Sequence, residues 1–326
     1  MIDVGPLRDG SDPVGVGAEL ARAASEVGFL YVRNHGVDAA TIEGARRAGF
    51  ELFRLPAAAK HEARTNRFHH GWLGPDSTKM YDDAKPDLKE SFNWGVEVGA
   101  EVEGKGETEA GAETETGAGN GAGAARPNPL AGPNVWPAAA PGLAPGVRPW
   151  FDRASACAED LLRGFAVGAG LDPEHFVRHR DRPLSRGSLQ YYPPHPRDAG
   201  KDRFGVAPHT DFGMLTVLAQ DDVGGLEIQR LTGEWVAMPP LPGTLVVNVG
   251  DLLERWSNRR YRSTVHRVIN RSGRERLSLV LAYDPNFETL VDPGAFCTGS
   301  ETPHDEPIRC GDYLLWRFEK AFAYRR

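Results

Sequence analysis

Two histidines and one aspartate in the second half of the chain have residue types and a spacing that suit a metal site. His209 and Asp211 stand two residues apart in the stretch APHTDFGMLTVLAQ, and His266 follows in STVHRVIN. Alternate residues of a strand point to the same face, so His209 and Asp211 are expected to project side by side. Polar side chains directed into a barrel interior are costly unless something satisfies them, and a metal ion would do so.

The ligand types indicate which metal this trio would take. Two imidazoles and one carboxylate make up the facial triad of non-haem Fe(II) oxygenases, whose remaining coordination positions serve a co-substrate and dioxygen. The set is neither all-thiolate nor all-oxygen, which suits a ferrous ion. The sequence therefore predicts that His209, Asp211 and His266 bind Fe(II).

A second polar pair follows ten residues after His266. In RERLSLVLAYDP, Arg276 and Ser278 share one face of a predicted strand, and the opposite face is entirely apolar. The apolar face must be buried, which turns the arginine and the serine toward the barrel interior. A charged arginine in that position is expensive unless an anion meets it. The pair therefore predicts an anion site.

The elements that would position these residues change character along the chain. Helical patterns cover residues 17–27, 39–55 and 150–169, and a closing helix is predicted at 311–326. From residue 187 onward, short alternating or apolar runs recur between turn residues, which favours an antiparallel jelly roll or barrel over a parallel sheet. We expect an α+β fold in which N-terminal helices pack on the outer face of this core and a C-terminal helix closes the chain.

Composition divides the chain without splitting it into separate domains. Residues 1–98 read as the N-terminal helix and strand region, and 127–326 as the remainder of the same domain, with the jelly-roll core at about 187–285. Between them, residues 99–126 contain mainly Gly, Ala, Glu and Thr. Such a segment cannot bury enough apolar surface to offset the entropy of ordering, so we expect a disordered acidic insertion.

Charge and cysteine usage narrow the classes of partner. The chain has 326 residues, a formal net charge of −7 and three widely spaced cysteines. This charge gives no support for nucleic-acid binding, and no apolar run reaches the length of a membrane-spanning helix. The N-terminal stretch lacks the pattern of a secretory signal. We expect a cytoplasmic protein that acts on a small molecule, with no nucleic acid, membrane or obligate protein partner.

Several longer stretches, read in order, resemble the 2-oxoglutarate/Fe(II)-dependent dioxygenase superfamily, and within it the isopenicillin N synthase-like family. They are GFLYVRNHGV, QYYPP, HTDFGMLTVLAQDDVGGLEIQ, LVVNVGDLLERWSN, STVHRVIN and RLSLVLAYDP. LKESFNWG and GPNVWP resemble bacterial members of that family. The resemblance covers nearly the whole chain outside the 99–126 insertion.

The resemblance implies a double-stranded β-helix (jelly-roll) core, a cofactor set and a reaction. Iron would be held by the two histidines and the aspartate named above, and 2-oxoglutarate would chelate the iron through its keto acid end. The far carboxylate of 2-oxoglutarate would lie against Arg276, with Ser278 and Tyr192 donating hydrogen bonds. Dioxygen would then oxidise a small molecule, by hydroxylation first and by desaturation or cyclisation as variants, with release of succinate and CO2. Bacterial secondary metabolism is the expected setting.

Two alternatives stay open at this point. One is an Fe(II) oxidase that does not use 2-oxoglutarate, similar to isopenicillin N synthase or to aminocyclopropane-carboxylate oxidase, in which Arg276 and Ser278 would hold the substrate's own carboxylate. The other is a non-catalytic jelly-roll binding protein. For the substrate itself, the candidate contacts are Phe92, His70 and Phe287.

Overall fold

The computed structural model describes residues 1–75, 77, 87–97, 128–194 and 204–322. The predicted 99–126 insertion lies outside these residues, and the proposed domain boundaries stay a prediction. Segments on both sides of that insertion nevertheless belong to one sheet, because β4 (Glu90–Gly95) pairs along its length with β5 (Arg186–Tyr192).

A large, mostly antiparallel sheet forms one wall of the fold, in the strand order β1-β2-β10-β7-β12-β5-β4-β3. Besides β4 and β5, its strands are β1 (Ile2–Asp3), β2 (Phe29–Arg33), β3 (Gly71–Leu73), β7 (Leu215–Ala219), β10 (Leu245–Val249) and β12 (Arg276–Tyr283). Its centre, β7-β12-β5, lies in the second half of the chain, and the N-terminal strands extend it at both edges.

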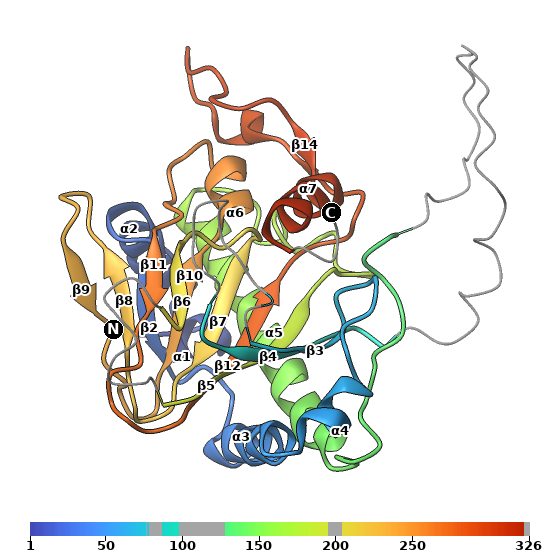
Figure 1. Cartoon of the computed structure of the whole chain (residues 1–326). Coiled ribbons are helices and arrows are strands. Elements are labelled where there is room, and N and C mark those ends of the chain that lie inside the picture. Colours follow the sequence, from blue (N-terminus) through green and yellow to red (C-terminus); the bar gives the residue numbers. More distant parts are fainter. Residues whose placement is uncertain (76, 78–86, 98–127, 195–203, 323–326) are drawn as a thin grey trace, which may run out of the picture.

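A smaller antiparallel sheet forms the opposite wall, in the order β6-β11-β8-β9. Its strands are β6 (Val206–His209), β8 (Leu226–Gln229), β9 (Trp235–Ala237) and β11 (His266–Val268). A buried cluster joins the two walls, because Leu218 and Val246 of the large sheet pack with Ile228 and Val268 of the small one. The predicted jelly roll is therefore confirmed, and both walls can be followed in Figure 1.

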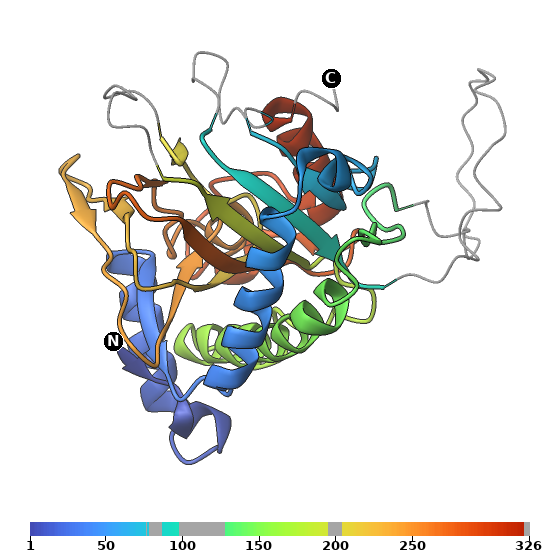
Figure 2. The same ribbon diagram turned by 60° about the horizontal axis from the view of Figure 1, so that its bottom comes forward.

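Three helices cover the outer face of the large sheet, as expected. They are α2 (Pro13–Glu26), α3 (Ala39–Phe53) and α5 (Leu143–Gly168), and α5 packs against both others (Figure 2). The predicted apolar face of β12 is buried beneath them: Leu277, Leu279 and Leu281 are fully covered. α3 lies so close to β12 that a Cβ on Gly49 would stand 2.8 Å from the Leu277 side chain.

The long helix α5 begins earlier than the sequence predicts. We expected it at residue 150, but it starts at Leu143 and includes Pro149. A proline inside a helix normally loses a hydrogen bond and clashes with the preceding turn. Pro149 is the seventh residue of this helix of 26 residues, which continues past it to Gly168.

The C-terminal segment completes one end of the barrel. α7 (Cys310–Ala321) lies across this end in Figure 1, as the predicted closing helix, and the pair β13 (Leu290–Val291) and β14 (Ile308–Arg309) precedes it. The remaining helices are short: α1 (Gly5–Arg8), α4 (Ala57–His61), α6 (Asp251–Trp256) and a 3-10 helix at Pro293–Phe296.

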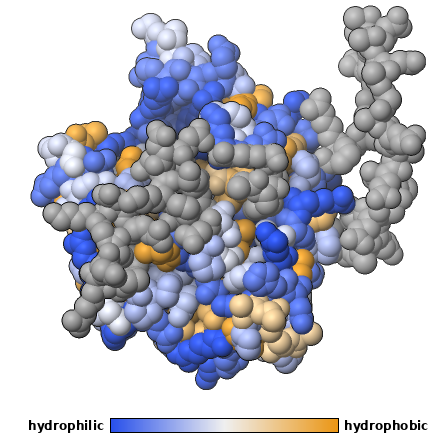
Figure 3. Space-filling model, in the orientation of Figure 1, coloured by the Kyte–Doolittle hydropathy of each residue, from blue (hydrophilic) through white to orange (hydrophobic). Residues whose placement is uncertain are grey.

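The face of the molecule that Figure 3 shows is largely polar where its residues are described. On the face shown in Figure 3, hydrophilic residues predominate and apolar ones are scattered between them. None of the helices in the described residues has both the length and the apolar character that crossing a bilayer requires.

Candidate metal centre and adjoining cavity

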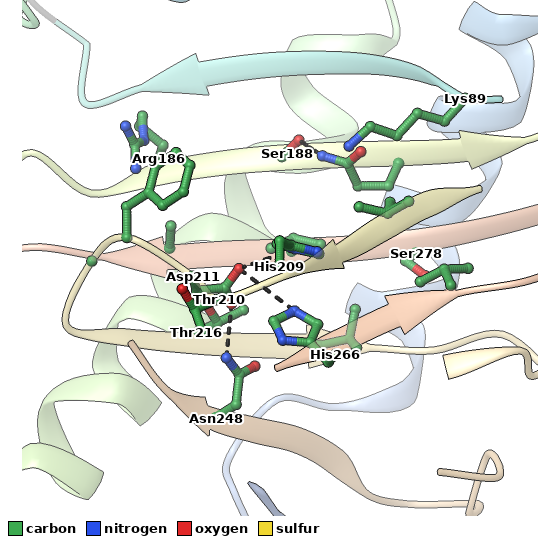
Figure 4. Close-up of a pocket in the computed structure, with 18 of the residues that line it drawn as sticks. Lys89, Arg186, Ser188, His209, Thr210, Asp211, Thr216, Asn248, His266 and Ser278 are labelled. Carbon is green, nitrogen blue, oxygen red and sulfur yellow. Dashed lines mark hydrogen bonds and ion pairs between the residues drawn. The ribbon is translucent and has the colours of Figure 1, made fainter. Parts of the chain in front are cut away.

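The three predicted ligands meet at one end of the small sheet. His209 is the last residue of β6 and His266 the first of β11, and the antiparallel register places them directly opposite each other. Asp211 follows in the loop that leads from β6 to β7. One ligand atom from each residue lies within 4.8 Å of the other two, and all three side chains face the same cavity (Figure 4).

Backbone carbonyls fix the orientation of both imidazoles. His209 Nδ1 lies 2.8 Å from the carbonyl oxygen of Ala207, and His266 Nδ1 lies 3.1 Å from that of Thr264. A carbonyl oxygen can only accept, so each Nδ1 must carry the proton and donate. The Nε2 lone pair of each ring is then left for a metal ion, the arrangement that metal-binding histidines normally have.

Asp211 is held through one of its two oxygens. Its Oδ2 accepts hydrogen bonds from Thr216 Oγ1 at 2.6 Å and from Asn248 Nδ2 at 2.7 Å. Its Oδ1 faces the histidines instead, 3.6 Å from the Nε2 atom of His209 and 3.6 Å from that of His266. The carboxylate thus presents one fixed oxygen to the two ring nitrogens.

The electrostatics of the trio favour the deprotonated forms that bind metals. Burial, followed by the neighbouring His266, lowers the pKa of His209 to about 3. Burial alone would raise the pKa of Asp211, but the two histidines and the hydrogen bonds from Asn248 and Thr216 outweigh it and lower this pKa to about 2. A neutral imidazole and an ionised carboxylate are therefore available at neutral pH. This set of two nitrogens and one oxygen fits a ferrous ion.

The predicted anion site lies deeper in the same cavity. Arg276 is 1% exposed, and its Nε donates to the carbonyl oxygen of Gly224 at 2.6 Å. Its Nη1 and the Oγ of Ser278 are both buried and have no hydrogen-bond partner among the described residues. Buried donors without partners are rare in native proteins. A bidentate carboxylate is the ligand that such an arginine fits best.

Tyr192 forms the wall behind this arginine. The register of β5 and β12 places Tyr192 opposite Arg276, and the guanidinium carbon lies 4.6 Å from the centre of the tyrosine ring. Burial raises the pKa of Tyr192 to about 12, so its hydroxyl keeps its proton and is able to donate. The structure therefore brings all six predicted metal and anion residues to one cavity.

The cavity has a volume of about 200 Å³ and two unlike ends. Around Arg276 the lining is largely aliphatic, from Val206, Leu218, Leu226 and Val268. Toward the barrel mouth it becomes polar and aromatic, with contributions from Asn93, Ser188, Gln190, His69, Phe212, Phe318 and Phe322. The aliphatic end suits the chain of a small diacid, and the other end lies open to a larger molecule.

A polar column at the open end was not predicted from the sequence. Gln190 donates to Ser188 Oγ at 2.6 Å, and Ser188 donates to Asn93 Oδ1 at 2.6 Å. Asn93 Nδ2 lies 3.2 Å from His69 Nε2, which it can reach as a donor. The signal for part of this column was present, because Gln190 and Ser188 have the same strand parity as Tyr192. Asn93 joins them through the neighbour order of β4 and β5, which no local pattern encodes.

The three predicted substrate contacts lie away from this cavity. Phe92 is fully buried on the opposite face of β4, where its ring lies 5.6 Å from that of Trp136. His70 is 2% exposed and, with Phe287, lines a separate cleft. For Phe92 the reason is strand parity, since Asn93 faces the cavity and its neighbour must face the helices.

Comparisons with known proteins cover both halves of the chain. A family model described as the 2OG-Fe(II) oxygenase superfamily matches residues 187–285, and one described as the N-terminal region of non-haem dioxygenase in morphine synthesis matches residues 1–139. A homoarginine-6-hydroxylase from Glycine max is 32% identical over 312 residues, which cover 90% of this chain and 87% of the relative.

Solved structures agree over nearly the full length. A full-length Neurospora crassa protein, solved in complex with alpha-KG, has a TM-score of 0.81 and 26% identity, covering 97% of this chain and 94% of the other. A putative 2OG-Fe(II) oxygenase family protein from Caulobacter crescentus has a TM-score of 0.79 and 25% identity, covering 98% and 97%. The curated relatives come from plants, fungi and Dictyostelium, so they do not support the expected bacterial source.

Proposed function

Because the chain belongs to the 2OG-Fe(II) oxygenase superfamily, we propose that it hydroxylates a small molecule at an Fe(II) ion held by His209, Asp211 and His266. The observation that carries this proposal is the orientation of Asp211. Thr216 and Asn248 fix one carboxylate oxygen, while the other faces two imidazole Nε2 atoms at 3.6 Å. A carboxylate and two imidazoles arranged in this way are prepared for one shared ion.

The chain's own residues define the roles of the rest of the cavity. Arg276 and Ser278 are proposed to bind the far carboxylate of 2-oxoglutarate, which would satisfy the two buried donors that lack partners among the described residues. The tyrosine ring of Tyr192 supports the guanidinium from behind. The aliphatic lining around them excludes water from the methylene groups of the co-substrate, which strengthens the charge pairing.

When bound, iron and 2-oxoglutarate supply oxidative decarboxylation with dioxygen, which oxidises the substrate and yields succinate and CO2. The protein's part in this chemistry is positional. Thr216 and Asn248 hold the carboxylate ligand, the carbonyls of Ala207 and Thr264 hold the imidazoles, and the open end of the cavity orients the substrate. Hydroxylation is proposed over desaturation or cyclisation because a relative named above is a hydroxylase.

The branch of the superfamily, the cellular compartment and the kind of metabolism are also proposals. We place the chain in the isopenicillin N synthase-like branch, on the stretches that resemble it, and in the secondary metabolism of a reducing cytoplasm. All three cysteines are free, and burial raises the pKa of the Cys157 thiol to about 12, so this thiol is protonated and unreactive at neutral pH. A free small molecule is the proposed partner, since the net charge of −7 does not suit a nucleic acid.

The deciding experiment is an anaerobic titration. Purified apo-protein is titrated with Fe(II) and then with 2-oxoglutarate, and the visible metal-to-ligand charge-transfer band of the chelate is recorded. We expect the band in the native protein, a weaker one in Arg276→Ala and none in His266→Ala. Tight iron binding without a band would favour the oxidase alternative, and a protein that binds no iron would overturn the metal site itself.

A further inference from the structure

Lys89 occupies a position that the proposed function does not use. It stands just before β4, in a short segment that joins the two walls of the barrel. Leu88 N donates to the carbonyl oxygen of Phe204 at 2.9 Å, and Asp87 Oδ1 accepts from Ala207 N at 3.0 Å. This segment therefore lies against the start of β6, the strand that ends at His209, and its backbone is fixed from both sides.

The side chain of Lys89 points into the metal-bearing cavity. Lys89 and Asn93 share one face of the β4 segment, and both line the cavity that contains His209 and Asp211. The residue is only 9% exposed. In Figure 4 its side chain extends from the start of β4 toward the middle of the cavity. An ammonium group is thus buried beside the reaction centre.

This ammonium lacks a hydrogen bond within the described part of the chain. Its ion-pair partner is Asp87, whose Oδ2 lies 3.9 Å from Lys89 Nζ, too far for a hydrogen bond. Burial lowers the pKa of Lys89, and the carboxylates of Asp87 and Asp211 offset this only in part. Lys89 Nζ is not among the fully buried polar atoms that lack a partner in the described residues, so its donors face the open space of the cavity. An ammonium has three donors, which a ligand with acceptor atoms would meet there.

Lys60, which is also buried, shows how the fold supplies hydrogen-bond acceptors to a lysine. Lys60 is 7% exposed, and its Nζ donates to Glu90 Oε2 at 2.6 Å and to the carbonyl oxygen of Phe53 at 3.1 Å. Lys89 is as deeply buried as Lys60, but the fold gives its donors no comparable acceptor. The difference leaves the Lys89 ammonium available to a ligand that enters the cavity.

We propose that Lys89 binds a carboxylate of the substrate, so that the enzyme acts on small organic acids. This inference rests on the proposed function and deepens it. A carboxylate supplies several acceptor sites to a compact ammonium, and the pairing is strong in a cavity that excludes water. The body of the acid would lie between the polar column of Asn93 and Ser188 and the aromatic side chains of His69 and Phe318.

The other cations of the cavity already have assigned partners. Arg186 lies 3.3 Å from Asp284 Oδ2, and Arg276 is opposite the proposed site of the far carboxylate of 2-oxoglutarate. The keto acid end of 2-oxoglutarate belongs to the metal. Both ends of the co-substrate are thus accounted for without Lys89, which leaves this cation for the carboxylate of the second reactant.

The test uses matched pairs of small molecules, because the natural substrate is unidentified. A library of carboxylic acids, each paired with its own primary amide, is incubated anaerobically with the protein loaded with Fe(II) and 2-oxoglutarate. Bound compounds are identified by mass spectrometry after size exclusion, and dissociation constants are then measured for the best pairs. Acid and amide have nearly the same shape, so a difference between them reports on charge.

We expect the native protein to retain acids in preference to their amides. Lys89→Met should weaken binding of the best acid by about 30-fold, as for truncation of one partner of a buried charge pair, and leave its amide nearly unchanged. Lys89→Arg keeps a cation and should keep the preference for acids. Lys320→Met, which removes one positive charge from the exposed end of α7, is the matched control and should behave like the native protein.

Three results would overturn the proposal. The first is a native protein that binds acids no better than amides, or binds neither, which needs no variant and so does not depend on how Lys89→Met folds. The second is an acid preference that survives in Lys89→Met. The third is a Lys89→Met protein that has lost affinity for 2-oxoglutarate, since the lysine would then serve the co-substrate. Failure of the proposed function would show separately, as the absence of the charge-transfer band in the native protein.

Discussion

Thr216 and Asn248 face each other across β7 and β10, and both donate a hydrogen bond to the same oxygen of Asp211. This pair explains why an aspartate in a loop can act as a fixed ligand. The loop sets only the position of its Cα, whereas two regular strands set the rotation of its carboxylate. Partners of this kind typically tune metal affinity by tenfold to a hundredfold.

Removing this support should weaken iron binding without unfolding the protein. We expect Thr216→Val, which keeps the side-chain shape, and Asn248→Ala each to raise the dissociation constant for Fe(II) by about tenfold or more. The measurement is an anaerobic Fe(II) titration against a coloured chelator. Thr244→Val, in a loop remote from the cavity, is the control for loss of a threonine hydroxyl. Unchanged iron affinity in both variants would refute the role assigned to the pair.

Arg276 and Ser278 should contribute unequally to the affinity for 2-oxoglutarate. Arg276→Ala removes a buried charge, so we expect a loss of about 100-fold in 2-oxoglutarate affinity. Ser278→Ala removes one hydrogen bond from a neutral donor to the carboxylate, worth ~1.5 kcal/mol, and a loss of about tenfold is expected. Both variants should bind Fe(II) as the native protein does. The midpoint of the charge-transfer band against 2-oxoglutarate concentration measures each effect, and equal losses in the two variants would contradict the assignment.

The anion site could be predicted because strand alternation is local: Arg276 and Ser278 lie two residues apart within β12, and this spacing places both side chains on one face. The side to which that face turns followed from the apolar opposite face of β12.

For the metal site the structure brings the predicted residues together, but the reason was incomplete. His209 ends β6 and Asp211 lies beyond it, so the hydrogen bonds from Thr216 and Asn248, rather than strand alternation, orient the carboxylate. That His266 stands directly opposite His209 is a matter of register between distant strands, and only the structure gives it.

The substrate end could not be predicted for the opposite reason. Asn93 reaches the cavity because β4 happens to neighbour β5, and Phe318 because α7 crosses the end of the barrel. Neither placement can be predicted from the sequence around these residues. Phe92 was predicted as a substrate contact because it is aromatic. Its residue type suits that role, but its position in β4 directs its side chain away from the cavity and into the core.

The buried ion pair between Lys60 and Glu90 should be important for stability. Glu90 Oε2 accepts from Lys60 Nζ at 2.6 Å and from Trp72 Nε1 at 2.8 Å. Glu90→Ala would leave the lysine charge buried without its partner, so we expect a loss of about 3 kcal/mol in the free energy of unfolding. Urea denaturation measures this. Glu234→Ala breaks an exposed pair with Arg230 and should cost less than about 0.5 kcal/mol.

A double variant separates the charge from the packing. Lys60→Met combined with Glu90→Leu removes both charges and keeps apolar volume, so its cost should be smaller than the sum of the two single losses. Additive losses would mean that Lys60 and Glu90 do not interact in the folded protein, despite the short distance between their charged groups.

His70 should make stability depend on pH, although it lies outside the metal-bearing cavity. Burial lowers the pKa of His70 from 6.5 to about 4, in a site where Nδ1 faces the carbonyl oxygen of Pro133 at 3.3 Å. Between pH 6.5 and about 4, His70 is protonated in the unfolded chain but neutral in the folded protein, so the free energy of unfolding falls as the pH falls. A difference of about 2.5 pKa units corresponds to a loss of ~3 kcal/mol, complete below pH ~4.

The way to isolate this effect is to compare two unfolding curves across pH. His70→Gln cannot take up the proton, so the difference in unfolding free energy between native protein and variant should shrink by ~3 kcal/mol from pH 7 to pH 4. Other groups titrate in this range, but they contribute equally to both proteins and cancel in the difference. His304→Gln, at an exposed position, should run parallel to the native protein. If the His70→Gln curve also ran parallel, the buried imidazole would have to be protonated in the folded state.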